Sequence, residues 1–289
     1  MPDDSRGKGT VIPVRRVEAV PAEVTSAVPR SVNPPDGAAE RLIKSADRVR
    51  DLGEVFTPRR IVDDMLNLLP DEVWSVFPQK TFLEPACGDG NFIVAILERK
   101  LDAVAEAWRS GALPAGDTAE ALHFHSLAAL SSLYGVDISA DNVVGATLEH
   151  PLGARARTVD AFQGWLQGTT GRSVTSRSRV MQCAVWVASA NIVVADMVSA
   201  SASGAAGSSF DVPLVEYEWN PAKRRVTLTD TSIGQLLNDA ESAAGDFQAS
   251  LFGPEEPVSR PAIAFLDLHK SGRPGHNENP ASQRGEAAK

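Results

Sequence analysis

Residues 82–92, FLEPACGDGNF, decide the fold of this chain. The run TFLE (81–84) is short, apolar and rich in residues that favour strands, so it predicts a buried strand. ACGDG predicts a tight turn because it contains two glycines, and residues 91–111 predict a long helix that ends near Gly111. A strand that turns directly into a helix is typical of open α/β sheets, in which ligands bind beyond the carboxyl ends of the strands.

The alternation of strands and helices continues on both sides of this unit. Thr57 and Pro58 favour the start of a helix, and helices are expected at 59–69, 117–132, 141–148 and 232–242. Further strands are expected at 133–138, 191–196, 211–219 and 224–229. This order predicts an α/β fold with a doubly wound, mostly parallel sheet that helices cover on both faces.

The ends of the chain differ from its centre. Residues 1–46 and 249–289 are rich in proline and small polar residues and lack an apolar period, so we expect both segments to be disordered. The residues between them, 47–248, are expected to form one domain of ordinary size. Within it, residues 199–209 contain only Ser, Ala and Gly, which predicts a mobile loop.

The overall charge narrows the classes of partner. The chain has 28 Lys and Arg residues against 37 Asp and Glu residues, a formal charge of −9. This argues against a protein that coats nucleic acid through bulk electrostatics, but it leaves room for a local basic groove. The two cysteines, Cys87 and Cys183, make no disulfide framework, and no apolar run is long enough to span a bilayer. We therefore expect a cytoplasmic protein without membrane association.

The loop after the first strand has the chemistry of a ligand site. Gly88 and Gly90 let the backbone approach a ligand closely, and Glu84 at the strand end suits a cationic group such as an amine. The spacing is not the dinucleotide pattern G-x-G-x-x-G, and Glu84 and Asp89 would repel a pyrophosphate. The expected ligand therefore carries an amino acid and a nucleoside. The alternative is a tight turn that binds nothing.

A family resemblance agrees with this chemistry. EPACGDGNF (84–92) resembles the S-adenosylmethionine-binding loop of N6-adenine DNA methyltransferases, usually Asp-Pro-Ala-Cys-Gly-Ser-Gly-x-Phe. Glu84 stands in place of Asp, and Asp89 in place of a residue that is often Ser or Thr. GEVFTP (53–58) is similar to the stretch that precedes this loop in the family and encloses the methionine end of the cofactor. The resemblance implies S-adenosylmethionine contacts from Phe56, Thr57, Pro58, Glu84, Pro85, Ala86, Gly88, Gly90, Asn91 and Phe92.

Two further segments extend the resemblance. YGVDI (134–138) resembles the family's second-strand motif, which implies that Asp137 binds both ribose hydroxyls and that Ile138 lies against the adenine ring. An acid at a strand end can accept from two vicinal hydroxyls, whereas the alternative for Asp137 is a turn acid or helix cap. NIVVADM (191–197) is similar to the third-strand motif, which implies that Asp196 recognises the adenine amino group. That pattern is short and common, so a purely structural role stays open for Asp196.

The motif that holds the target amine in this family, Asn-Pro-Pro-Tyr or its Asp variant, is missing. FDV (210–212) resembles the start of the corresponding strand, and NPAK (220–223) offers Asn and Pro without the aromatic residue. Asn220 is therefore the candidate catalytic residue, with Tyr217 or Trp219 as a candidate stacking ring, and a plain turn is the alternative. Few residues follow, so sequence-specific reading of DNA would need a partner subunit.

These features predict a DNA adenine-N6 methyltransferase of restriction-modification type that uses S-adenosylmethionine. The alternative is a catalytically degenerate subunit of the same fold with a binding or regulatory role. A third is a methyltransferase for RNA or protein, and the glycine spacing disfavours a nicotinamide dehydrogenase. No metal is expected, because His123 and His125 point to different faces of a helix, and Cys87 is expected to be a packing residue.

An arginine-rich segment stands apart from these motifs. Residues 151–180 contain five arginines and one acid, Asp160. Two interpretations stay open for it, a solvated surface stretch and a local surface that contacts phosphates.

Overall fold

A three-stranded parallel sheet lies at the centre of the computed structural model, which describes residues 48, 50, 55–145, 152–197, 212–233, 235 and 258–272. Its strands are β1 (Phe82–Glu84), β2 (Leu133–Asp137) and β3 (Ile192–Val194), in the order β1-β2-β3. Leu83 pairs with Tyr134, and Val136 pairs with Val193. The first, second and third predicted strands are therefore neighbours, and their carboxyl ends meet at one edge. The predicted mixed α/β class with a parallel sheet is confirmed.

Helices precede, connect and follow the strands. They are α2 (Arg59–Leu66), η1 (Asp71–Trp74), α3 (Asn91–Arg109), α4 (Ala119–Ser131), α5 (Ala140–Val143), α6 (Ala154–Thr170), α7 (Arg179–Asn191) and η2 (Phe265–Lys270). In α3, Ile93, Leu97, Leu101 and Val104 recur at helical spacing and are fully buried, which fixes one face of this helix on the core. The helix predicted at 141–148 is shorter, since α5 ends at Val143.

A second, antiparallel sheet replaces the expected extension of the parallel one. β4 (Pro213–Asn220) and β5 (Arg225–Ser232) form a hairpin, and β6 (Val258–Ser259) and β7 (Ile263–Ala264) both pair with β5. The expectation of a mostly parallel sheet was wrong for the segments 211–219 and 224–229. The physical reason is the connection: only residues 221–224 join the two strands, and a parallel crossover needs about a dozen residues.

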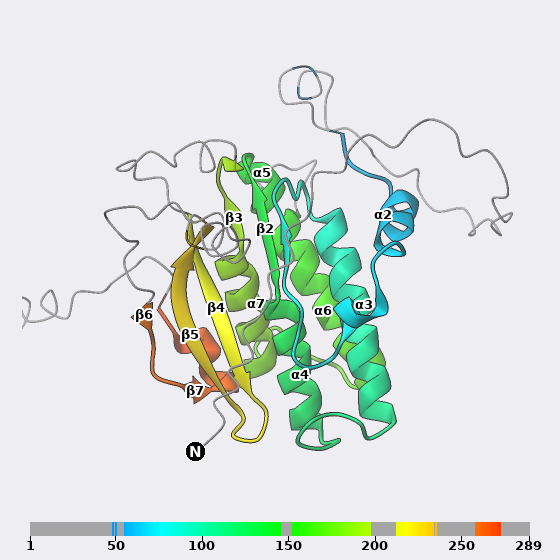
Figure 1. The fold of residues 1–289 in the computed structure, drawn as a ribbon, viewed down its shortest axis with the longest axis vertical. Helices are drawn as coiled ribbons and strands as arrows, with labels where there is room; N and C mark the ends of the chain where they lie inside the picture. The colour runs from blue at the N-terminus through cyan, green and yellow to red at the C-terminus, as the bar shows by residue number, and fades with distance from the viewer. Residues whose placement is uncertain are drawn as a thin grey trace, which may run out of the picture.

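The two faces of the parallel sheet pack differently. Tyr134 and Val136 point to one face and pack with Leu214 of β4 and with Ile233, which directly follows β5. Leu133 and Ile192 belong to the other, helical core. The far end of the hairpin extends past the sheet, where the Trp219 ring meets Phe124 of α4 edge to face. Among the described elements, then, the main helices pack on one face and the hairpin packs on the other (Figure 1), so a doubly wound arrangement is not confirmed.

The arginine-rich segment divides in two: residues 171–179 are mostly exposed, as a solvated surface stretch would be, whereas residues 154–170 belong to the helical core. Residues 154–170 form α6, and Phe162 and Leu166 of this helix are fully buried. Arg155 Nε donates to the Ile192 carbonyl (2.7 Å), and Arg157 contacts the loop after β1. Neither a solvated stretch nor a phosphate-contacting surface describes these two arginines. Apolar residues at helical spacing outweigh the arginine content here.

Part of the expected C-terminal disorder is also contradicted. Residues 258–272 form β6, β7 and η2, and Phe265 and Leu268 are buried against α7. Apolar residues at 263, 265 and 268 fill the core beside the hairpin, which the local proline content concealed. The predictions for 1–46, for the loop at 199–209, for the start of the strand at 210–211 and for most of the helix at 232–242 lie outside the described residues.

In the described part of the chain, no helix combines the length and apolar character that crossing a bilayer requires.

Candidate functional site

A cavity of about 480 Å³ opens at the carboxyl edge of the parallel sheet. Its walls come from the residues after β1, β2 and β3 and from the segment before α2. All predicted cofactor contacts except Pro58 and Gly90 line it, namely Phe56, Thr57, Glu84, Pro85, Ala86, Gly88, Asn91, Phe92, Asp137, Ile138 and Asp196. Four sequence segments that resembled separate motifs therefore meet at one cavity.

Sequence reasoning missed several lining residues. These are Val55, Cys87, Asp89, Ser139, Asn142, Ala195 and Met197. Six of them adjoin a predicted contact in the sequence, so widening each motif by one residue would have included them. Asn142 lies inside α5 and reaches the cavity because that helix starts beside the end of β2.

Two glycines shape the loop between β1 and α3. Gly88 has φ +54° and Gly90 has φ +97°, which is the left-handed region that favours glycine. A Cβ on Gly88 would lie 3.1 Å from the Phe56 ring, and one on Gly90 would lie 3.0 Å from the Ala154 Cβ. Gly90 therefore supports the loop from behind rather than lining the cavity. Pro58 is likewise outside the cavity, where its carbonyl accepts from the Ile61 N–H at the start of α2 (2.9 Å).

Asp137 ties the cavity walls together. Its Oδ2 accepts from the Gly88 N–H (2.9 Å), and its Oδ1 accepts from the Ser139 N–H (2.9 Å) and Asn142 Nδ2 (3.0 Å). A carboxylate offers about four acceptor positions, so these bonds leave capacity at Oδ2 for about one further donor. The bonds to Ser139 and Asn142 fit the capping alternative in part. Asp137 thus holds the loop and keeps room for one further donor.

Glu84 is an acid whose pKa is changed by burial in the cavity wall. Burial raises the pKa of this half-buried carboxyl. The hydrogen bond that Glu84 Oε1 accepts from the Ala86 N–H (3.2 Å) lowers the pKa, and the nearby charge of Asp137 raises it further. A carboxylate in this state gains from a cationic ligand, because the cation would offset both the desolvation and the repulsion from Asp137.

The cavity as a whole is acidic. Glu84, Asp89, Asp137 and Asp196 line it, and within the described part of the chain no Lys or Arg does. Ile138, which is 57% exposed, adds an apolar surface at the rim. The walls therefore favour a ligand with positive groups and a flat apolar part over a phosphorylated one.

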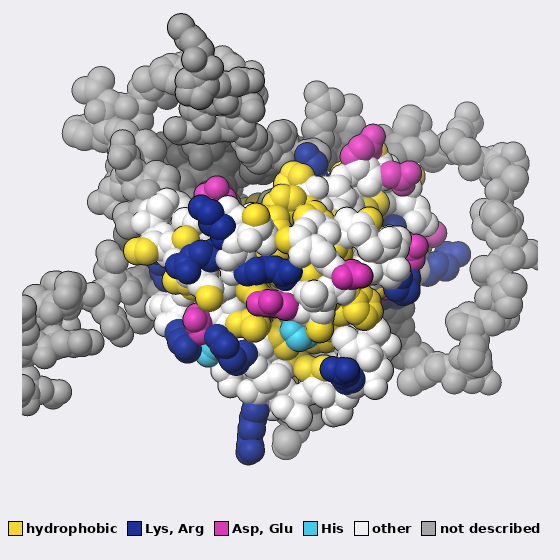
Figure 2. All heavy atoms as spheres, turned by 90° about the horizontal axis from the view of Figure 1, so that it is seen from below, with side chains coloured by type: hydrophobic (Ala, Val, Ile, Leu, Met, Phe, Trp, Pro, Cys, Tyr) yellow, Lys and Arg dark blue, Asp and Glu magenta, His cyan; other side chains and the backbone are white. Residues whose placement is uncertain are grey.

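The candidate catalytic residue lies elsewhere. Asn220 ends β4 at the turn of the hairpin, where its Oδ1 accepts from the Lys223 N–H (3.0 Å). Trp219 Nε1 donates to Ser131 Oγ (2.9 Å). Ser131 precedes the start of β2, so this turn lies at the amino edge of the sheet. Figure 1 shows the turn at the bottom of the molecule, and Figure 2 views that end, where Lys and Arg side chains are spread over the surface.

The structure therefore does not bring Asn220 to the acidic cavity, and its contacts fit the turn alternative. The two candidate rings do not line the cavity either. Trp219 is buried against Phe124, and Tyr217 Oη donates to Asn191 Oδ1 (2.9 Å) inside the core. A plain strand-to-turn sequence mimicked the motif because Asn and Pro are also common turn residues.

Other reactive side chains have structural roles. Cys87 is buried with its Sγ 3.2 Å from where a Gly135 Cβ would stand, and burial is the main cause of its raised pKa. His125 is fully buried with Nε2 2.9 Å from the Pro114 carbonyl oxygen. Within the described ranges, no three His, Cys, Asp or Glu residues are grouped so that they could hold a metal ion.

A second cavity, of about 580 Å³, lies along α7 between β3, the start of β4 and η2. Its described lining includes Trp186, Arg155 and His269 but no carboxylate and none of the predicted cofactor contacts. It is chemically different from the acidic cavity.

Comparison with protein-family models, curated proteins and solved structures found no match to this chain.

Proposed function

We propose that this chain binds S-adenosylmethionine in the acidic cavity at the carboxyl edge of β1–β3. The observation that supports the proposal is the lining: segments 55–57, 84–92, 137–142 and 195–197 meet there with four carboxylates, and none of the described lining residues is basic. S-adenosylmethionine has a sulfonium, an ammonium, a ribose and an adenine, and it supplies an activated methyl group. These groups match the charge and the chemistry of the walls.

The residues divide into roles along the cavity. Glu84 would accept from the ammonium group, with the Phe56–Thr57 segment beside the methionine end. Asp137 Oδ2 would accept from one ribose hydroxyl, Ile138 would cover the adenine ring, and Asp196 would accept from the adenine amino group. The protein's contribution in this arrangement is to orient the ligand and exclude water around it.

The same walls disfavour a dinucleotide. A phosphate charge about 4 Å from one carboxylate is repelled by roughly 1–4 kcal/mol, depending on solvent exposure. Carboxylates line several sides of the cavity, and none of the described lining residues is basic, although Arg157 pairs with Asp89 from outside the walls (2.6 Å).

The proposed activity is methylation of the adenine N6 amine in DNA. A second candidate is a subunit that binds S-adenosylmethionine without transferring its methyl group, and the position of Asn220 favours it. In the first case, the target amine is held by residues outside the described ranges or by a partner subunit.

Isothermal titration calorimetry tests the binding proposal. We expect S-adenosylmethionine to bind the intact chain, NAD to show no heat at the same concentration, and Glu84→Gln to weaken binding at least about tenfold. Asp160→Asn, which removes an exposed acid on α6, serves as the matched control and should bind like the wild type. A folded wild-type protein that binds no S-adenosylmethionine would refute the proposal.

Transfer of a tritiated methyl group to unmethylated DNA separates the two candidates. Incorporation into adenine supports the methyltransferase. Binding without incorporation, with and without candidate partner subunits, supports the second candidate.

A further inference from the structure

One arginine outside the cavity contacts two of the residues that form its walls. Arg157 of α6 donates from Nη1 to the Asp89 carbonyl (2.9 Å) and from Nη2 to Asn91 Oδ1 (2.8 Å). Its Nη1 also forms an ion pair with Asp89 Oδ1 (2.6 Å), a buried oxygen that accepts no hydrogen bond. The guanidinium therefore contacts both the loop after β1 and the first residue of α3.

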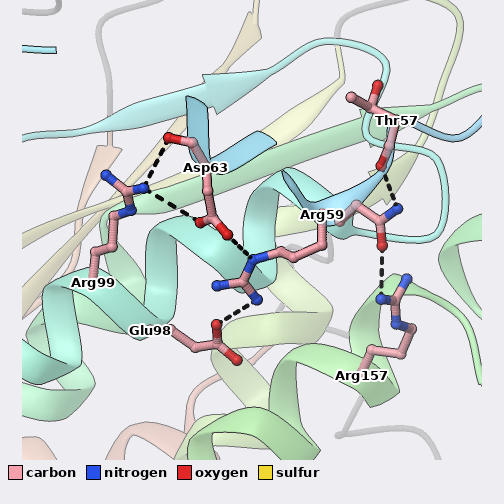
Figure 3. Close-up of polar contacts among 7 residues, drawn as sticks. Thr57, Arg59, Asp63, Glu98, Arg99 and Arg157 are labelled. Carbon is pink, nitrogen blue, oxygen red and sulfur yellow. Dashed lines mark hydrogen bonds and ion pairs between the residues drawn. The ribbon is translucent and has the colours of Figure 1, made fainter. Parts of the chain in front are cut away.

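The contact continues through Asn91 to a third segment. Asn91 Nδ2 donates to the Thr57 carbonyl (3.0 Å). Because Arg157 can only donate, it fixes which end of the Asn91 amide faces it, and the amino end must then face Thr57. Figure 3 shows Arg157 and the Thr57 carbonyl reaching the same amide from opposite sides.

We propose that Arg157 is a positioning residue for the acidic cavity, acting through Asn91. It orders the loop at 88–91 directly and orders the segment 55–57 through the amide of Asn91. Phe56 in that segment lies against Gly88, so the two walls also pack on each other. The link to S-adenosylmethionine rests on the proposed function, whereas the ordering of the walls does not.

A neighbouring ion-pair network offers a control. Arg59 contacts Asp63 (2.9 Å) and Glu98 (2.7 Å), and Arg99 contacts Asp63 (3.3 Å), so these residues fasten α2 to α3 (Figure 3). The side chains of Arg99 and Arg157 are similarly exposed, 25% and 30%. The hydrogen bonds of Arg99 go to Asp63, which is not a lining residue of the cavity. Arg99→Gln is therefore matched to Arg157→Gln.

Hydrogen–deuterium exchange of the full chain without ligand tests the ordering. Arg157→Gln should speed exchange about fivefold at both 55–57 and 88–91, the factor that corresponds to losing a hydrogen bond of about 1 kcal/mol. Asn91→Asp keeps an acceptor for Arg157 and suits the first turn of a helix, but it cannot donate to Thr57. It should speed exchange at 55–57 alone. Arg99→Gln should change neither segment.

This pattern distinguishes positioning from a general loss of stability. If Asn91→Asp leaves 55–57 unchanged, or if Arg99→Gln has the same effect as Arg157→Gln, the proposal is overturned. Should Arg157→Gln fail to fold because Asp89 loses its counter-ion, Arg157→Lys keeps the charge, loses the planar fork and should still speed exchange at 55–57.

Titration with S-adenosylmethionine gives the second readout. Arg157→Gln and Asn91→Asp should each weaken binding about tenfold, and the double variant should be no weaker than the worse single variant, because both act along one chain of contacts. Additive losses would overturn the action through Asn91. No binding by the wild type would refute the proposed function, and the exchange pattern would still decide whether Arg157 orders the walls.

Discussion

Replacing Asp137 by Asn tests the central contact of the cavity with a change of one atom. The carboxylate accepts from Gly88 on one oxygen and from Ser139 and Asn142 on the other. An amide has only one oxygen, so this acceptor can face either Gly88 or the pair Ser139 and Asn142, but not both. We expect it to face Ser139 and Asn142, which retains two bonds, and to turn its NH₂ group toward the Gly88 N–H.

The cost follows from this geometry. One hydrogen bond to a charged acceptor is lost, worth about 1.5–3 kcal/mol, and two donors then face each other at Gly88. We expect the free energy of unfolding to fall by about 2 kcal/mol and affinity for S-adenosylmethionine to fall at least about tenfold, since Gly88 lines the cavity.

Urea unfolding and calorimetric titration measure the two effects. Asp160→Asn makes the same chemical change at an exposed position on α6 and should alter neither. If Asp137→Asn unfolds at the wild-type urea concentration, the carboxylate does not hold the loop as described, and the reasoning is refuted.

Three further predictions concern other parts of the molecule. Because the pKa of Glu84 is raised mainly by burial, the folded chain binds its proton more readily than the unfolded chain, so stability falls as pH rises through that folded pKa. Glu84→Gln should therefore raise the free energy of unfolding measured by urea at pH 7 while weakening ligand binding. A lower free energy of unfolding would contradict this. Burial lowers the pKa of Lys100 from 10.5 to about 7, so the unfolded chain holds more protons above pH 7 and stability should rise by about 3 kcal/mol from pH 7 to pH 10. Lys100→Met should abolish that rise, and an unchanged pH profile would count against it. Asn220→Ala should cost less than about 1 kcal/mol and leave ligand affinity unchanged, whereas a large loss of affinity would return Asn220 to the site.

The sequence by itself determined the local unit and most of the cavity. The strand, the glycine turn and the helix at 81–111 depend on neighbouring residues, so periodicity and turn chemistry predict them. The carboxyl ends of β1, β2 and β3 meet because parallel neighbours share an edge, which brought Glu84, Asp137 and Asp196 to one place.

Only the tertiary structure decided what covers the sheet and what holds the cavity in shape. The hairpin β4–β5 covers one face, and its turn carries Asn220 to the far end of the molecule. Arg157 reaches Asp89 across 68 positions of sequence, a contact that no local pattern encodes. Such pairings depend on how separate segments pack, because their free energy comes from burial between elements rather than from the sequence around each residue.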